Sequence, residues 1–202
     1  MSQPDHAPLE GTLADVESAM RKGRATQLWI VGAFGVAIGI ALLLLVGTDD
    51  EARVYGEIGK RVNGINRGRF DQFWACALQT DNVGDIRSNA ELSAKLDARG
   101  DERGRRYGVH LRERCLPNLE KIAPELETLI VPPDLQLDVT ALLEANGRLR
   151  GSVSEYVAYL DNPELDYDPE VARPVLGRVA RAWYDFKKAH GAINTKVKGK
   201  LK

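Results

Sequence analysis

The sequence has few of the residues that most often hold a metal ion or attack a substrate. It contains two cysteines, three histidines and two methionines among 202 residues. Cys76 and Cys115 do not form a Cys-x-x-Cys pair, and the histidines are far apart in the sequence, so a zinc-type ligand spacing is missing. We therefore predict neither a metal site nor a cofactor.

Short catalytic motifs are missing as well. There is no Gly-x-Ser-x-Gly nucleophile motif and no phosphate-binding glycine loop. His110 precedes Cys115 by five residues, which in an α-helix turns the two side chains about 140° apart and argues against a Cys–His dyad in that helix. The acidic stretch 161–170 has Pro169 where a calcium-binding loop of the EF-hand type needs glycine. We predict that the protein is not an enzyme. The least favoured alternative is catalysis by carboxylates that only the fold brings together.

A bias toward one sign of charge is also missing. Lys and Arg number 28 and Asp and Glu 29, a net charge of −1, which gives no global attraction to nucleic acid. A local excess of positive charge occurs in residues 193–202, which hold four lysines and no acidic residue. They have no interleaved aromatic residues for base stacking, so we expect a solvated basic tail and no nucleic-acid partner.

One long apolar run stands out. Residues 28–47 contain no charged side chain, and about 20 such residues span the roughly 30 Å hydrocarbon core as a helix. The run is too long for a signal-peptide core and lacks a small-residue cleavage pattern. We predict a transmembrane signal-anchor helix.

The flanking charges predict how this helix is oriented. Arg21, Lys22 and Arg24 precede it and acids follow it at 49–51, so the positive-inside rule places the N-terminus in the cytoplasm and the C-terminal domain outside the inner membrane, in the periplasm. Gly35 and Gly39 form a small-xxx-small pair. It predicts helix packing in the membrane, although small residues are common in such helices for other reasons.

Beyond the anchor, helical periodicity dominates. The strongest pattern starts at Asp134, expected to cap the helix, and ends at Asp161. Its apolar positions alternate in steps of three and four, like a heptad seam. The seam comprises Val139, Leu142, Asn146, Leu149, Val153, Tyr156 and Leu160. Asn146 is the polar member, and we expect it to fix the register between helices.

Weaker patterns predict four further helices. They cover 51–79, 88–100, 102–130 and a last helix that starts at 168–169 or 173–174. Ser88 begins a capping-box sequence, and Gly100 is expected to end that short helix in a left-handed conformation. Pro117 and Pro124 should kink or break the helix that contains them.

Together these patterns predict an all-α chain: a single transmembrane helix followed by an antiparallel bundle of four long helices plus one short helix. The expected division is a partly disordered cytoplasmic tail (1–27), the anchor (28–47), the bundle (48–192) and a basic C-terminal tail (193–202).

The two cysteines fall on the apolar faces of different predicted helices. A Cys76–Cys115 disulfide would close a loop of about 39 residues, worth roughly 3–4 kcal/mol in the chain-entropy model. Export favours this disulfide, whereas a cytoplasmic domain would favour two buried thiols.

The leading functional prediction is a membrane-anchored, extracytoplasmic interaction or scaffold module whose partner is another envelope protein or a second copy. The alternative is a ligand-sensing or ligand-carrying bundle, because an anchor plus a four-helix bundle resembles the sensor modules of bacterial receptors.

Overall fold

The periodic part of the sequence folds into helices, and the computed structural model describes residues 48–80, 82–163 and 166–201. The regular structure in these ranges is entirely helical, which confirms the all-α prediction there. The predicted cytoplasmic tail (1–27) and anchor (28–47), including Gly35 and Gly39, lie outside the described residues. None of the described helices is both long enough and apolar enough to cross a membrane.

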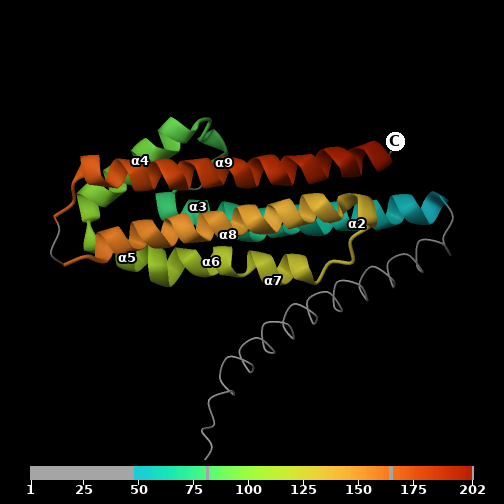
Figure 1. Cartoon of the computed structure of the whole chain (residues 1–202), viewed down its shortest axis with the longest axis horizontal. Coiled ribbons are helices and arrows are strands. Elements are labelled where there is room, and N and C mark those ends of the chain that lie inside the picture. Colours follow the sequence, from blue (N-terminus) through green and yellow to red (C-terminus); the bar gives the residue numbers. More distant parts are fainter. Residues whose placement is uncertain (1–47, 81, 164–165, 202) are drawn as a thin grey trace, which may run out of the picture. The chain divides into compact units, whose positions relative to one another are not determined.

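Four antiparallel helical segments, called legs below, make up the bundle (Figure 1). The first leg consists of α2 (Thr48–Ile65), the π-helical turn η1 (Asn66–Phe70) and α3 (Asp71–Leu78). The second consists of α5 (Arg105–His110), the π-helical turn η3 (Leu111–Cys115), α6 (Leu116–Glu120) and α7 (Ile122–Glu127). The third and fourth legs are α8 (Pro133–Asp161) and α9 (Pro169–Lys200). Between the first two legs, the 3-10 turn η2 (Val83–Asp85) leads into α4 (Asn89–Arg103), which packs on α9.

Side-chain contacts fix the direction of each leg. Lys196 of α9 pairs with Asp138 near the start of α8, whereas Arg178 pairs with Glu155 near its end. These two helices are therefore antiparallel. The first and second legs are antiparallel as well. Arg61 hydrogen-bonds to Thr128, and Arg69, later in the first leg, pairs with Glu125, earlier in the second.

The start of α4 was predicted correctly, but its end was not. Ser88 is the N-cap, and its Oγ accepts a hydrogen bond from the backbone N–H of Glu91 at 3.1 Å. The helix then runs through Gly100 and ends at Arg103. Gly104 follows as its C-cap, with a positive φ of 47° that glycine adopts more readily than other residues. Gly100 is buried against tyrosine side chains, so it serves helix packing rather than helix termination.

Proline divides the second leg as expected. Pro117 lies in the first turn of α6, where its missing N–H costs no helical hydrogen bond. Pro124 lies in α7, and the chain between α6 and α7 leaves the helix at Lys121. The predicted helix 102–130 is therefore a series of short helical pieces with one common apolar face.

Helix α8 carries the predicted seam. All seven seam positions from Val139 to Leu160 are buried, which confirms the sequence pattern. The predicted cap was wrong: the helix begins at Pro133 after Pro132, and Asp134 lies in the first turn. There its carboxylate accepts a hydrogen bond from the Tyr55 hydroxyl at 2.5 Å, so it joins α8 to α2 instead of capping its own helix.

The structure also differs from the predicted basic tail at 193–202. Asp168 caps the last helix by accepting from the N–H of Glu170 at 2.9 Å, and α9 continues to Lys200. Ile193 and Val197 are buried. Val197 packs on Gly59 of α2, where a side chain would leave no room for it. Burial of these two apolar residues extends the helix beyond the point at which its lysines suggested a solvated tail.

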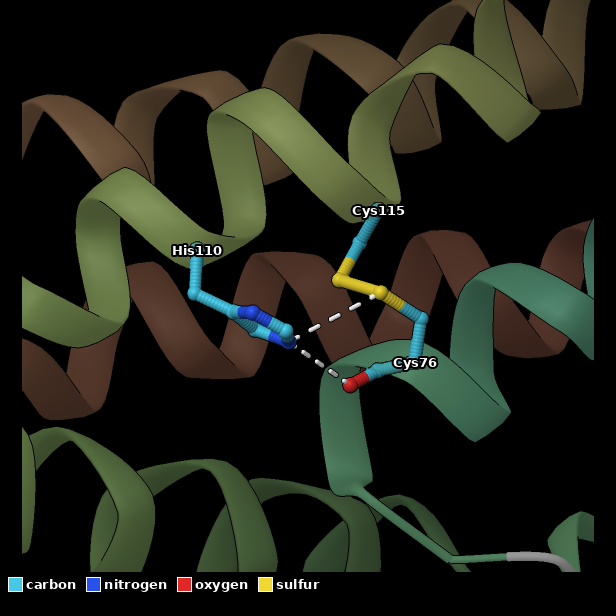
Figure 2. Close-up of side chains that lie close together, drawn as sticks. All are labelled: Cys76, His110 and Cys115. Carbon is cyan, nitrogen blue, oxygen red and sulfur yellow. Dashed lines mark hydrogen bonds between the residues drawn. A yellow bond between two sulfur atoms is a disulfide. The ribbon is translucent and has the colours of Figure 1, made fainter.

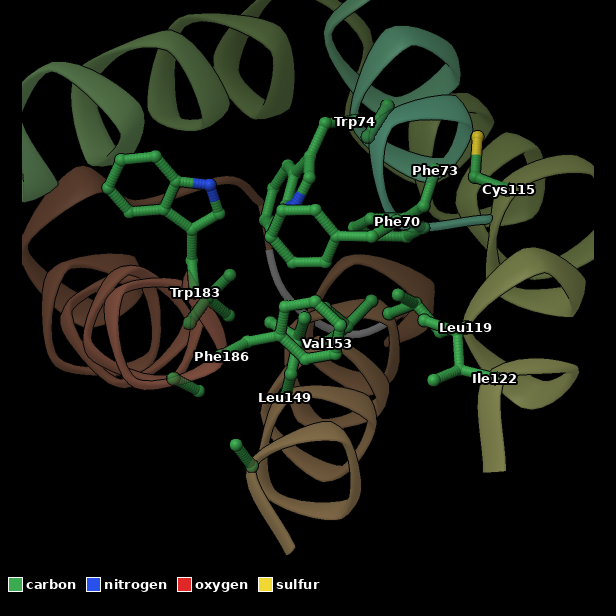
Figure 3. Packing of buried hydrophobic residues seen from close by; sticks show 14 of the residues in the cluster. Phe70, Phe73, Trp74, Cys115, Leu119, Ile122, Leu149, Val153, Trp183 and Phe186 are labelled. Atoms are coloured by element: carbon green, nitrogen blue, oxygen red, sulfur yellow. The ribbon is translucent and has the colours of Figure 1, made fainter. Parts of the chain in front are cut away.

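Aromatic side chains fill the centre of the bundle (Figure 3). Phe70 and Phe186 stack with ring centroids 4.2 Å apart, which joins the first leg to α9. Phe73 and Trp74 meet edge to face at 4.7 Å and are fully buried. The axis of the bundle is therefore occupied by the protein's own side chains at this level.

Candidate functional site

A disulfide joins the first two legs near the middle of the bundle. Cys76 of α3 and Cys115 at the end of η3 are bonded, with their Cα atoms 5.5 Å apart. This confirms the predicted pairing and closes a loop with a sequence separation of 39. Cys115 is fully buried, whereas Cys76 is only partly buried. An external reagent therefore reaches the bond more easily from the Cys76 side.

His110 lies directly beside this disulfide (Figure 2). Its Nε2 is 3.7 Å from Sγ of Cys76 and 3.2 Å from the Cys76 carbonyl oxygen. Because a carbonyl oxygen only accepts, that second contact requires a proton on Nε2. One ring nitrogen of His110 and the two sulfur atoms all lie within 4.8 Å of one another.

The expected separation of His110 and Cys115 was wrong because the chain between them is not an α-helix. Residues 111–115 form the π-helical turn η3. Its i→i+5 bonds give about 4.4 residues per turn, so five residues rotate only about 50° beyond a full turn. The wider turn brings the imidazole and the buried sulfur to the same side. Single π turns of this kind are frequent at functional sites.

A polar cleft of about 420 Å³ lies next to the disulfide, with His110 as part of its wall. The other lining residues are Gln79, Glu102, Arg103, Arg106 and Tyr107. Arg103 donates to the side-chain oxygen of Gln79 at 2.9 Å, and the buried Tyr107 donates to the carbonyl of Ala77 at 2.8 Å. Burial raises the pKa of the Tyr107 hydroxyl, so it acts as a fixed donor that holds α5 against α3.

A second polar cluster joins α2 to α9 and was not predicted. Asn63 and Asn194 donate to each other at 3.0 and 3.1 Å, and Nε2 of His190 lies 3.1 Å from the Asn63 oxygen. His190 is partly buried in this cluster. Burial lowers its pKa from the ordinary value of 6.5, so the neutral ring is favoured.

Asn146 is the buried polar residue of the α8 seam, with 1% of its surface exposed. Its side-chain amide donates to the carbonyl of Leu119 at 3.2 Å, while its own oxygen has no hydrogen-bond partner among the residues that the structure describes. The contact joins α8 to α6. It agrees with the type of interhelical bond expected of a residue that fixes register, and the role in register stays a prediction.

The beginning of α2, the beginning of α8 and the end of α9 meet at one end of the bundle. Lys200 contacts Glu51 at 3.1 Å and Asp134 at 3.8 Å, and its hydrogen bond to Glu51 is the main reason that its pKa is raised. Lys196 pairs with Asp138 at 2.5 Å. Lysines that the sequence suggested were free thus hold the helix ends together.

No family model, no curated protein and no solved structure matches the chain. The class of protein is therefore defined by the residues themselves: an all-helical bundle with four legs, one disulfide between the first two, and a histidine against that disulfide.

Proposed function

We propose that this protein is an interaction module held at the membrane by residues 28–47, and that it binds a partner protein of the same envelope through the end of the bundle at which α2 begins. The partner is another envelope protein or a second copy of the chain. One observation carries the proposal: large apolar side chains are exposed at this end.

Three of the five large apolar residues exposed in the described part of the chain lie there. Ile130, between α7 and α8, is 70% exposed; Leu137, in the second turn of α8, is 81% exposed; Leu201, after α9, is 50% exposed. The Lys200–Asp134 and Lys196–Asp138 contacts bring together the end of α9 and the start of α8, and the exposed apolar residues lie on or next to these helix ends. Exposed apolar groups gathered among charged ones are typical of protein contact surfaces.

The position of the predicted anchor supports the same end. Helix α2 starts at Thr48, directly after the last residue of the 28–47 run. In the sequence, the predicted anchor is therefore followed directly by the helix whose start lies at this end of the bundle.

The filled interior favours a surface function over the ligand-carrying alternative. The Phe70–Phe186 stack and the buried Trp74 occupy the space between the legs in which a bundle would enclose a small molecule. The disulfide supports a location outside the cytoplasm, because such bonds persist in oxidising compartments.

Site-specific photo-cross-linking of the full-length chain in native membranes tests the proposal. A photo-reactive residue is placed at Leu137 and, as the matched control, at Val171, which is 51% exposed at the start of α9. We expect a discrete cross-linked protein from Leu137 and none from Val171. A product of twice the mass would identify self-association, and another mass an envelope partner.

Cross-linking only to lipid, or equal products from both positions, would contradict the proposal. The location is tested separately by maleimide labelling in intact cells. Thiols that label only after reduction and denaturation support export, whereas thiols that label after denaturation alone argue against it.

A further inference from the structure

The cluster of Cys76, Cys115 and His110 has a use beyond joining two legs. We propose that reduction of the disulfide converts this cluster into a three-ligand site for a thiophilic divalent cation, with Zn²⁺ as the expected ion. The ligands are the two thiolates and Nε2 of the imidazole. In the oxidised protein the disulfide blocks the site, so that the redox state decides whether the cation binds.

The distances already approach those of a tetrahedral site. With Zn–S near 2.3 Å and Zn–N near 2.05 Å, a tetrahedron places sulfur and nitrogen about 3.6 Å apart and two sulfurs about 3.8 Å apart. Nε2 of His110 is 3.7 Å from Sγ of Cys76, close to the first value. The sulfurs are now bonded, and two unbonded sulfurs must move apart to about the second value. A cation between them needs little further movement.

The donor set selects the class of cation. Two thiolates and one imidazole prefer soft or borderline ions such as Zn²⁺ over Mg²⁺ or Ca²⁺, which prefer oxygen. Three protein ligands leave a fourth tetrahedral position for water or a small ligand. The polar cleft that His110 lines gives that position a path to solvent.

The chemistry balances with a thiol reductant. One thiolate of the reductant attacks Sγ of Cys76, the more accessible sulfur, and the S–S bond breaks with Cys115 leaving as the thiolate. A second thiol of the reductant then releases Cys76, so two electrons and two protons reach the protein and the reductant leaves as its disulfide. Binding of Zn²⁺ subsequently expels the two thiol protons.

The imidazole must change as well. Nε2 now carries the proton that bonds the Cys76 carbonyl, and a metal ligand needs this nitrogen bare. Binding therefore moves the ring proton to Nδ1 and replaces the bond to the carbonyl with a bond to the ion. His110 reaches this position because of the π turn η3, which links a structural irregularity directly to the proposed site.

The experiment uses the full-length chain in detergent, reduced with dithiothreitol that is then removed without oxygen. Zn²⁺ is titrated by calorimetry in two buffers of different protonation enthalpy, and Co²⁺ is used as a spectroscopic probe of thiolate coordination. We expect one Zn²⁺ per reduced chain, with release of two protons, and no binding to the oxidised chain. Zn²⁺ should also raise the thermal midpoint of the reduced chain.

Variants distinguish this site from chance binding. His110→Ala should weaken Zn²⁺ binding at least about 100-fold, since even groups that only orient a metal ligand contribute 10- to 100-fold. His190→Ala, which removes a histidine from the α2–α9 cluster, is the matched control and should bind as the parent does. The circular dichroism spectrum and thermal midpoint of each oxidised variant show whether it still folds.

Three results would overturn the proposal: a reduced parent that binds no Zn²⁺, an oxidised chain that binds it equally well, or a His110→Ala variant with unchanged affinity. The proposed membrane partner does not enter this test, so failure of one proposal leaves the other standing.

Discussion

The hydroxyl of Tyr156 in α8 occupies the space that a side chain on Gly100 of α4 would need. Tyr156 is buried there and donates to the carbonyl of Leu96 at 2.9 Å. The ring of Tyr167 covers the same position from the loop before α9. The Tyr167 hydroxyl donates to the carboxylate of Asp97 at 2.5 Å. Gly100 thus allows three segments to meet, and a single methyl group there tests the arrangement.

Gly100→Ala should destabilise the protein by about 1–3 kcal/mol, because overpacking at a buried contact displaces the two tyrosines. The control is Gly147→Ala in α8, an exposed helical position with nothing within 4 Å of the added carbon. It should stabilise by up to about 1 kcal/mol through helix propensity. Urea unfolding followed by circular dichroism measures both, and equal stability of the two variants would contradict the packing described here.

Reduction of the Cys76–Cys115 disulfide should lower the free energy of unfolding by about 3–4 kcal/mol, because the unfolded chain regains the entropy of a loop with a sequence separation of 39. The urea midpoint of the parent is compared with and without dithiothreitol, in the absence of divalent metal. A Cys76→Ala/Cys115→Ala double variant is the control, and its midpoint should not respond to the reductant. A parent that is equally insensitive would show that the bond contributes little.

His190 should make stability depend on pH below neutrality. Burial lowers its pKa below the ordinary 6.5, so the unfolded chain takes up the proton first as the pH falls. The folded state therefore loses stability between about pH 6.5 and its lower folded pKa, and keeps it above that range. The difference in unfolding free energy between the parent and His190→Gln should be constant above about pH 7 and shrink on acidification. A difference that stays flat down to about pH 5 would contradict the burial argument.

Asn146 should distinguish a buried charge from a buried apolar group. Asn146→Asp removes the donor to Leu119 and buries an unpaired carboxylate, which should cost more than about 3 kcal/mol near neutral pH and less in acid, where the carboxyl is protonated. Asn146→Leu leaves no unpaired amide oxygen and should change stability by less than about 2 kcal/mol. If Leu119 and Asn146 fix the register, nuclear magnetic resonance spectra of the leucine variant should show more than one packing state.

Most helices could be predicted because their signals are local. The steps of three and four residues in α8 correctly gave a buried face from Val139 to Leu160. Ser88 could be recognised as a helix start because capping depends on neighbours within three residues, and 168–169 was one of the two predicted starts of the last helix. The errors occur where distant residues compete with such signals: Tyr55 binds Asp134, and Tyr156 packs on Gly100.

The candidate site could be predicted only in part. With two cysteines in the chain, one intramolecular pairing exists, and the sequence favoured it. His110 was not expected beside it, because α-helical geometry turns it away from Cys115 and its separation of 34 residues from Cys76 carries no spacing signal.

The sequence by itself determined that residues beyond Gly47 form an all-helical bundle, since periodicity, caps and prolines act over a few residues. Only the tertiary structure decided that η3 widens into a π turn, that α9 continues to Lys200, and that His110 meets the disulfide. The last two depend on contacts with another leg: Val197 of α9 packs on Gly59, and His110 contacts Cys76. The free energy of such contacts arises between residues far apart in the chain, so no short stretch of sequence encodes it.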